Sequence, residues 1–169
     1  MIILLNGSIN SGKSTIAKLL AKHIPNLAIV EIDVLREFIR FMPLSEAIPI
    51  NLKNACSIIK NLSNRNINCV VPYPLSLKNL NYISKQLIKF KKDIYRFTLS
   101  PRLEIATQNR GTRKLTQKEI ERIRYHYSIS INSPSFGEII DNSNQKPEQT
   151  AELILNRLKK PKGLEGLLR

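Results

Sequence analysis

The chain reads Gly7-Ser8-Ile9-Asn10-Ser11-Gly12-Lys13-Ser14-Thr15 near its N-terminus, and this segment matches the phosphate-loop pattern G-x-x-x-x-G-K-[ST]. The apolar residues 2–6 before it predict a buried strand, and residues 13–23 after it have the spacing of an amphipathic helix. An ordinary glycine turn needs neither neighbour, whereas a working phosphate loop needs both. The segment therefore predicts an α/β protein that binds a phosphorylated nucleotide.

The residue types in this loop fit contact with a triphosphate. Glycines at 7 and 12 let the backbone wrap tightly, so that successive N–H groups and the helix N-terminus face an anion. Lys13 is expected to bridge the β- and γ-phosphates, and Ser14 is expected to ligate Mg²⁺. The expected nucleotide-binding residues of the segment are Gly7, Asn10, Ser11, Gly12, Lys13, Ser14 and Thr15.

Short apolar runs alternate with helical patterns along the rest of the chain, which is typical of a doubly wound α/β sheet. The runs are rich in Ile, Val and Leu, as in parallel strands covered on both faces. The sequence predicts a five-stranded parallel sheet with helices on both faces, and its strands are expected at 2–6, 27–32, 67–71, 94–99 and 138–141. Helices are expected at 13–23, 34–41, 45–64 with an interruption around Pro49, 76–90, 101–109, 117–131 and 147–159.

Two helix starts carry local signals. Ser100-Pro101 offers an N-cap followed by proline at the first helical position. Thr116 and Glu119 have the spacing of a capping box, in which each side chain reaches an N–H group at the helix start. We therefore expect helices to begin at these two places.

Length and composition indicate one globular domain. The chain of 169 residues suffices for one hydrophobic core, and its 42% hydrophobic and 24% charged residues exclude a disordered chain. We expect a domain at 1–160 and a flexible tail at 161–169. A cytoplasmic location is expected, because no apolar run reaches the length of a membrane span and no basic leader is present. Cys56 and Cys69 are expected to be buried thiols rather than zinc ligands.

The charge of the chain is strongly unbalanced. There are 27 Lys and Arg residues against 13 Asp and Glu residues, which gives a formal net charge of +14. Segment 78–124 alone holds thirteen basic and four acidic residues. This field would attract a nucleic acid, but a site for a nucleotide and a phosphorylated product also needs clustered cations, and an AT-rich genome raises the Lys content without any function.

An acidic residue follows the second predicted strand. In the segment 30–36, Asp33 lies where ligands gather outside the carboxyl ends of parallel strands. Its carboxylate would take the proton of an acceptor hydroxyl and orient that oxygen, and Arg36, one turn later, would hold an anionic group of the substrate. Asp33 also suits a helix N-cap, which is compatible with the first role. Arg36 could equally lie on a solvated helix face beside Arg40.

The phosphate loop, Asp33-x-x-Arg36 and a later arginine-bearing segment together make the chain resemble the small P-loop kinases. The branch in question contains chloramphenicol phosphotransferase, shikimate kinase, adenylylsulfate kinase, zeta toxins and polynucleotide kinases. The likeness spans most of residues 1–157 and implies a nucleoside monophosphate kinase-like fold that uses ATP and Mg²⁺. It also implies that Asp33 is the base or hydroxyl-orienting residue. Glu31 with Asp33 looks like the paired acids of shikimate kinases, in which the first acid positions Mg²⁺ through water.

A basic segment lies between two predicted helices. Arg110-Gly111-Thr112-Arg113-Lys114 places three cations around a glycine. The resemblance implies a lid near 109–116, in which Arg110 is the catalytic and nucleotide-binding arginine that neutralises the transferring phosphoryl group, and Arg113 binds substrate. A solvated basic loop is the alternative.

The third predicted strand departs from many P-loop proteins, because no acid ends it. Adenylylsulfate kinases also lack this acid, so Mg²⁺ would depend on Ser14, water and the acids near Asp33. The missing acid disfavours a motor-type ATPase. The turn Pro72-Tyr73-Pro74 after the strand either shapes the acceptor pocket or is a plain rigid turn.

Three further features carry weaker signals. His23 lies at the end of a predicted helix and His126 lies beside the apolar face of another, and both are interpreted as structural. Segment 139–147 resembles the last strand of these kinases and the loop that cups adenine.

The leading hypothesis is an ATP-dependent phosphotransferase that moves the γ-phosphoryl group to a hydroxyl of a small molecule, with Lys13, Asp33 and Arg110 as catalytic residues. A polynucleotide 5′-hydroxyl kinase is the alternative favoured by the charge, although no aromatic stacking cluster is evident. A catalytically silent nucleotide-binding module is the third hypothesis, and the presence of Asp33 and Arg110 argues against it. The motifs do not identify the acceptor.

Overall fold

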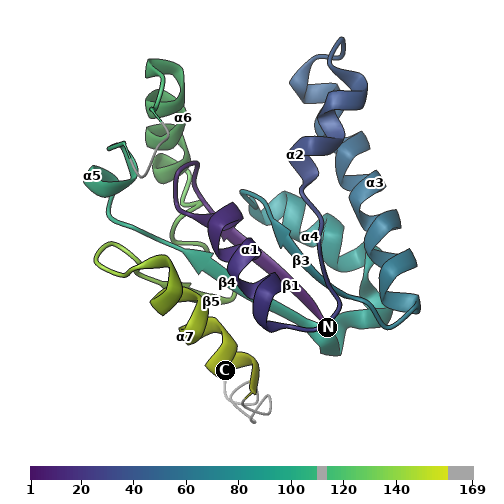
Figure 1. Cartoon of the computed structure of the whole chain (residues 1–169). Coiled ribbons are helices and arrows are strands. Elements are labelled where there is room, and N and C mark those ends of the chain that lie inside the picture. Colours follow the sequence, from purple (N-terminus) through teal and green to yellow (C-terminus); the bar gives the residue numbers. More distant parts are fainter. Residues whose placement is uncertain (110–113, 160–169) are drawn as a thin grey trace.

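The computed structural model describes residues 1–109 and 114–159. Its centre is a five-stranded sheet in which all neighbouring strands run parallel, in the order β2-β3-β1-β4-β5 (Figure 1). The strands are β1 (Ile2–Gly7), β2 (Leu27–Ile29), β3 (Asn68–Pro72), β4 (Ile94–Leu99) and β5 (Glu138–Ile140). The predicted α/β fold class with five parallel strands is therefore confirmed.

Helices connect each strand to the next. The α-helices are α1 (Lys13–His23), α2 (Ile32–Leu35), α3 (Leu44–Asn64), α4 (Leu77–Gln86), α5 (Leu103–Ala106), α6 (Gln117–Ser128) and α7 (Pro147–Lys159). Two 3₁₀ helices, η1 (Arg36–Ile39) and η2 (Ile88–Asp93), follow α2 and α4. Within residues 1–109 and 114–159, none of the helices is long and apolar enough to cross a membrane.

Helices cover both faces of the sheet, which explains why residues 2–5 of β1 are all apolar. Side chains alternate between the faces of a strand, so Ile2 and Leu4 pack into one core cluster with residues of α3 and α4. Ile3 and Leu5 pack into a second cluster with residues of α1 and α7. Figure 1 shows these two helix pairs on opposite sides of the sheet. Both cysteines are buried and free, as predicted for Cys56 and Cys69.

The central position of β1 fixes the location of the site. After β1, the strands β2 and β3 lie beyond one edge of β1, and β4 and β5 lie beyond its other edge. The carboxyl end of β1 therefore lies at the point where the strand order reverses, which is where open parallel sheets bind ligands. The loop 7–12 lies at this point.

The second strand is shorter than predicted. β2 ends at Ile29, although the Val30 N–H group still donates to the Val70 carbonyl oxygen over 2.9 Å. Glu31 then becomes the N-cap of α2, so the helix expected at 34–41 begins two residues early and continues as η1. Asp33 consequently lies inside the first turn of α2 and does not cap it.

The predicted interruption of the third helix around Pro49 is wrong, because α3 runs unbroken from Leu44 to Asn64. Proline removes one N–H group, whose acceptor would be the Ser45 carbonyl oxygen, and α3 tolerates this loss in its second turn. Burial of the apolar face, which includes Leu52, Ala55 and Ile59, holds the helix together.

Of the two predicted caps, one is confirmed and one is wrong. Thr116 and Glu119 form the capping box at the start of α6. The Ser100-Pro101 start fails, because the Ser100 N–H group donates to the Ile140 carbonyl oxygen over 2.9 Å and so continues the pairing of β4 with β5. The helix α5 begins only after Arg102, its N-cap residue.

Candidate functional site

The loop between β1 and α1 has the backbone that its glycines predict. Gly7 has φ +143°, and a Cβ atom there would lie 2.5 Å from Ser11 Oγ and 2.6 Å from the Leu99 carbonyl oxygen. Gly12, immediately before α1, has φ +97°, and Asn10 has φ +61°. Three left-handed residues within six positions wrap the chain into a tight loop around the N-terminus of α1.

The lysine of the loop and a histidine of α6 meet at Ser8. The Lys13 ammonium donates to the Ser8 carbonyl oxygen over 2.6 Å. Ser8 Oγ lies 3.3 Å from Nδ1 of His126. Burial, reinforced by the positive charges of Arg122 and Lys13, lowers the pKa of His126 to about 4, so the ring is neutral at physiological pH. The structure therefore links α6 to the phosphate loop through an uncharged imidazole.

Asn10 links the other side of the loop to α5. Its Nδ2 atom donates to the carbonyl oxygens of Ala106 and Gln108, over 2.9 and 2.8 Å. These residues lead directly into the segment that the sequence assigns to the lid. The left-handed backbone and the side chain of Asn10 thus both serve the shape of the loop.

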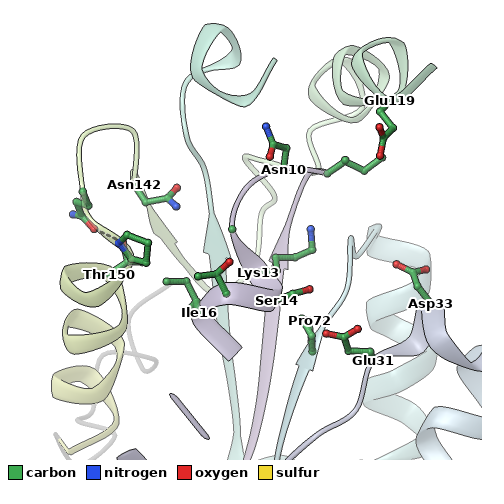
Figure 2. A pocket seen from close by; sticks show the side chains of 15 residues that line it. Asn10, Lys13, Ser14, Ile16, Glu31, Asp33, Pro72, Glu119, Asn142 and Thr150 are labelled. Atoms are coloured by element: carbon green, nitrogen blue, oxygen red, sulfur yellow. Dashed lines mark hydrogen bonds between the residues drawn. The ribbon is translucent and has the colours of Figure 1, made fainter. Parts of the chain in front are cut away.

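A cavity of about 700 Å³ opens above the loop at the carboxyl end of the sheet. Figure 2 shows Lys13 in its middle, with Glu31 and Asp33 on one side and Asn142 and Thr150 on the other. Residues from five separate parts of the chain form its walls: Ile9, Asn10, Gly12, Lys13, Ser14, Thr15, Ile16, Glu31, Asp33, Pro72, Glu119, Asn142, Gln145, Pro147 and Thr150. The cavity therefore joins the phosphate loop to the end of β2 and to the loop after β5.

Asp33 is exposed to this cavity, yet the surrounding protein raises the pKa of its carboxyl group. Burial is the main cause, and the negative charge of Glu31 adds to it. The positive charges of Lys13, Arg122 and Arg36 act in the opposite direction without cancelling the burial. A carboxylate with a raised pKa binds a proton more strongly, which suits a group that accepts a hydroxyl proton.

Tyr73, directly after β3, lies next to this carboxylate. It is 6% exposed, and burial, followed by the charge of Asp33, raises the pKa of its phenol to about 12. Arg122 counteracts this rise. The phenol thus stays protonated and remains a potential hydrogen-bond donor within electrostatic reach of Asp33.

A magnesium ion fits the oxygen donors gathered here. The hydroxyl of Ser14 and the carboxylates of Glu31 and Asp33 line the same cavity. Mg²⁺ takes few protein ligands and keeps water and phosphate oxygens around it. The described part of the chain holds no cluster of three or more His, Cys, Asp or Glu residues that could hold a metal ion.

The structure brings most of the sequence-predicted residues together. Asn10, Gly12, Lys13, Ser14, Thr15 and Asp33 line the cavity. Gly7 and Ser11 lie behind the cavity surface, where they shape the loop. Arg36 starts η1 outside the lining, although its charge still reaches Asp33. Arg110 and Arg113 lie outside the described residues.

Sequence reasoning missed the contribution of α6. Glu119 lines the cavity, and Arg122 acts electrostatically on Asp33, Tyr73 and His126. Glu119, Arg122 and His126 are spaced three and four residues apart, so they share one face of the helix. That spacing was visible in the sequence, but only the fold shows that this face of α6 is turned toward the phosphate loop and Asp33.

Neither family models nor curated proteins match the chain. Solved structures do match it over nearly the whole length. The tunicamycin resistance protein of Deinococcus radiodurans superposes with a TM-score of 0.70 at 16% identity, over 95% of this chain and 96% of that chain. The Mycobacterium tuberculosis APS kinase CysC, in complex with AMPPNP and APS, superposes with a TM-score of 0.68 at 18% identity, over 94% and 97%.

A sugar kinase from Janibacter sp. HTCC2649 gives a TM-score of 0.69 at 18% identity, over 92% of each chain. At such low identity the likeness concerns the fold. The chain has the fold of small P-loop kinases, and the resemblance seen in the sequence is confirmed at that level.

Proposed function

We propose that the chain is an ATP- and Mg²⁺-dependent phosphotransferase that moves the γ-phosphoryl group to a hydroxyl of a small molecule. The observation that carries this proposal is the single cavity lined by Lys13 and Ser14 on one side and by Asp33 on the other. In-line transfer requires a donor site and an acceptor site within one cavity.

On the donor side, the ammonium of Lys13 would exchange the Ser8 carbonyl oxygen, its present partner, for phosphate oxygens. The N–H groups of the loop and of the first turn of α1 would bind the same anion. Ser14, with Glu31 and Asp33 nearby, would hold Mg²⁺, which neutralises charge on the phosphate oxygens when bound. The AMPPNP in the complex of the APS kinase CysC supports ATP as the donor.

On the acceptor side, Asp33 would orient the acceptor hydroxyl and accept its proton. Its raised pKa favours that step. Arg36, whose charge reaches Asp33, would hold an anionic group of the acceptor. Arg110 and Arg113 are proposed, from the resemblance, as the lid residues that contact the phosphoryl group and the substrate. Arg122 of α6 supplies a cation from the described part of the chain.

The test is transfer of label from γ-labelled ATP to a panel of hydroxyl compounds, from sugars and nucleosides to oligonucleotides. Lys13→Ala should abolish transfer and ATP binding while the protein stays folded, because the side chain lines the cavity and belongs to neither core cluster. Lys18→Ala, on an exposed position of the same helix, is the matched control and should transfer like the wild type. Unchanged turnover in Lys13→Ala would overturn the proposal.

A polynucleotide 5′-hydroxyl acceptor is a second candidate, because the net charge of +14 favours a polyanion. Binding of an oligonucleotide would then weaken steeply as salt is added. Labelled oligonucleotide product would favour this candidate over a small-molecule acceptor. Nucleotide binding with no transfer to any acceptor would favour a silent binding module instead.

A further inference from the structure

One side chain connects the end of β5 to the phosphate loop. Asn142 follows β5 by two residues and is 3% exposed. Its Nδ2 atom donates to the Ser11 carbonyl oxygen over 3.0 Å. A Cβ atom placed on Gly12 would lie 3.8 Å from the same Nδ2 atom. The amide of Asn142 therefore lies against the peptide that joins Ser11 to Gly12.

The glycine on one side of this peptide leaves it free to turn over unless another group holds it. The peptide unit is planar, so its carbonyl oxygen and its N–H group point in opposite directions. Gly12 has φ +97° and no side chain to oppose a rotation. If the unit turned, the Ser11 oxygen would replace the Gly12 N–H group at the surface that faces the anion. A hydrogen bond that holds the Ser11 oxygen consequently also fixes the direction of that N–H group.

The hydrogen bonding of Asn142 argues against a purely structural role. Its Oδ1 atom is buried and has no hydrogen-bond partner among the described residues. A buried unpaired acceptor costs stability. An apolar residue of similar size would avoid this cost but would leave the Ser11 oxygen without its donor. The amide of Asn142 thus lowers stability through its unpaired oxygen, but its N–H group holds the Ser11 carbonyl oxygen of the phosphate loop.

We propose that Asn142 is a positioning residue that orients the Ser11–Gly12 peptide so that its N–H group faces the phosphate chain of the bound nucleotide. The inference rests on the proposed nucleotide binding. It assigns Asn142 to recognition of the polyphosphate, although the residue lies at the end of the cavity that the sequence assigns to the base.

The test compares binding of ATP, GTP and inorganic tripolyphosphate by the wild type and by Asn142→Ala. Loss of a hydrogen bond that acts through the loop should weaken binding of all three by about tenfold, with the ATP-to-GTP affinity ratio unchanged. Asn61→Ala is the matched control. Asn61 is exposed on α3 and lies outside the cavity lining, so this variant should bind like the wild type.

Asn142→Leu keeps the volume of the side chain without its donor, and it should show the same loss. Melting temperatures measured without ligand show which of the two Asn142 variants is folded, and the binding comparison uses that variant. A loss confined to ATP or GTP would mean that Asn142 reads the base, and undiminished binding of tripolyphosphate would overturn the inference. A wild type that binds none of the three compounds would instead overturn the proposed function, and the inference with it.

Discussion

The Asp33 carboxylate is the group on which the acceptor side depends. Its neighbours Lys13 and Arg122 favour the charged form, and burial opposes them and prevails. Asp33→Asn removes the proton acceptor but keeps the shape, so kcat should fall by about a hundredfold or more. The Kd for ATP, measured by calorimetry without Mg²⁺, should not rise, because a negative charge near the phosphates has been removed.

Glu37→Gln is the matched control for that experiment. Glu37 lies on η1, one turn after Asp33, and forms an exposed ion pair with Arg40. Its removal should leave kcat unchanged, since surface pairs contribute little. Equal turnover of Asp33→Asn and Glu37→Gln would show that Asp33 has no part in the transfer.

Residues were predictable from sequence where a local motif carries their chemistry. Lys13 and Ser14 follow from their places in the phosphate loop, and Asp33 follows from the end of a strand. Asn142 had no such signal, because the Ser11 carbonyl oxygen that it holds lies 131 positions away. Contacts of this range exist only after the sheet has assembled.

The helix α6 carries a cation over the acceptor side and offers its own control. Arg122 and Arg124 are both exposed on this helix, but only Arg122 acts on Asp33, Tyr73 and His126. Arg122→Ala should lower kcat by about tenfold or more, because less positive charge faces the transferring group. Arg124→Ala removes the same charge from another face and should keep the wild-type rate in the label-transfer assay. Equal rates for the two variants would contradict a role for Arg122.

The contact between α6 and the phosphate loop makes stability depend on pH. The folded protein holds the pKa of His126 at about 4, below its ordinary value of 6.5. Between these values the unfolded chain binds a proton that the folded state excludes, so stability is complete above pH 6.5 and decreases as the pH falls toward 4. His126→Gln should flatten this part of the curve of melting temperature against pH.

His23→Gln is the control for the pH experiment, because His23 is exposed at the end of α1, where its Nδ1 atom lies 2.9 Å from the Leu19 carbonyl oxygen of its own helix. This variant should keep the wild-type slope. If His126→Gln loses stability toward pH 4 as steeply as the wild type does, the buried imidazole is not the source.

Elements were predictable where the signal lies within the element itself. The capping box of Thr116 and Glu119 places the start of α6 correctly, because both partners belong to one turn. The signal at Ser100-Pro101 failed, because Ser100 pairs with Ile140 and the Pro101 carbonyl oxygen accepts a hydrogen bond from the Tyr127 hydroxyl. Partners from β5 and α6 thus hold the segment extended. Local sequence propensity does not include such long-range contacts.

The fold class follows from a pattern that the whole chain shares. Apolar runs without polar alternation indicate strands covered on both faces, and all six residues of β1 are buried. The order of the strands is a property of the assembled sheet, in which β1 pairs with β3 and β4 rather than with β2. That order brings segments that are distant in sequence together around one cavity.

The net charge of +14 should make the stability of the whole molecule depend on salt concentration. Like charges repel one another most in the compact state, so screening them should stabilise the fold. The melting temperature should therefore rise as NaCl is increased from about 0.01 M to about 0.5 M, over which the screening length falls from about 30 Å to a few ångströms.

The measurement needs a buffer without phosphate, because phosphate would bind the loop. Lys13→Ala should show the same rise, since it removes one positive charge of 27. A rise confined to the wild type would mean that chloride binds in the phosphate loop, and a constant melting temperature would mean that charge repulsion does not limit stability.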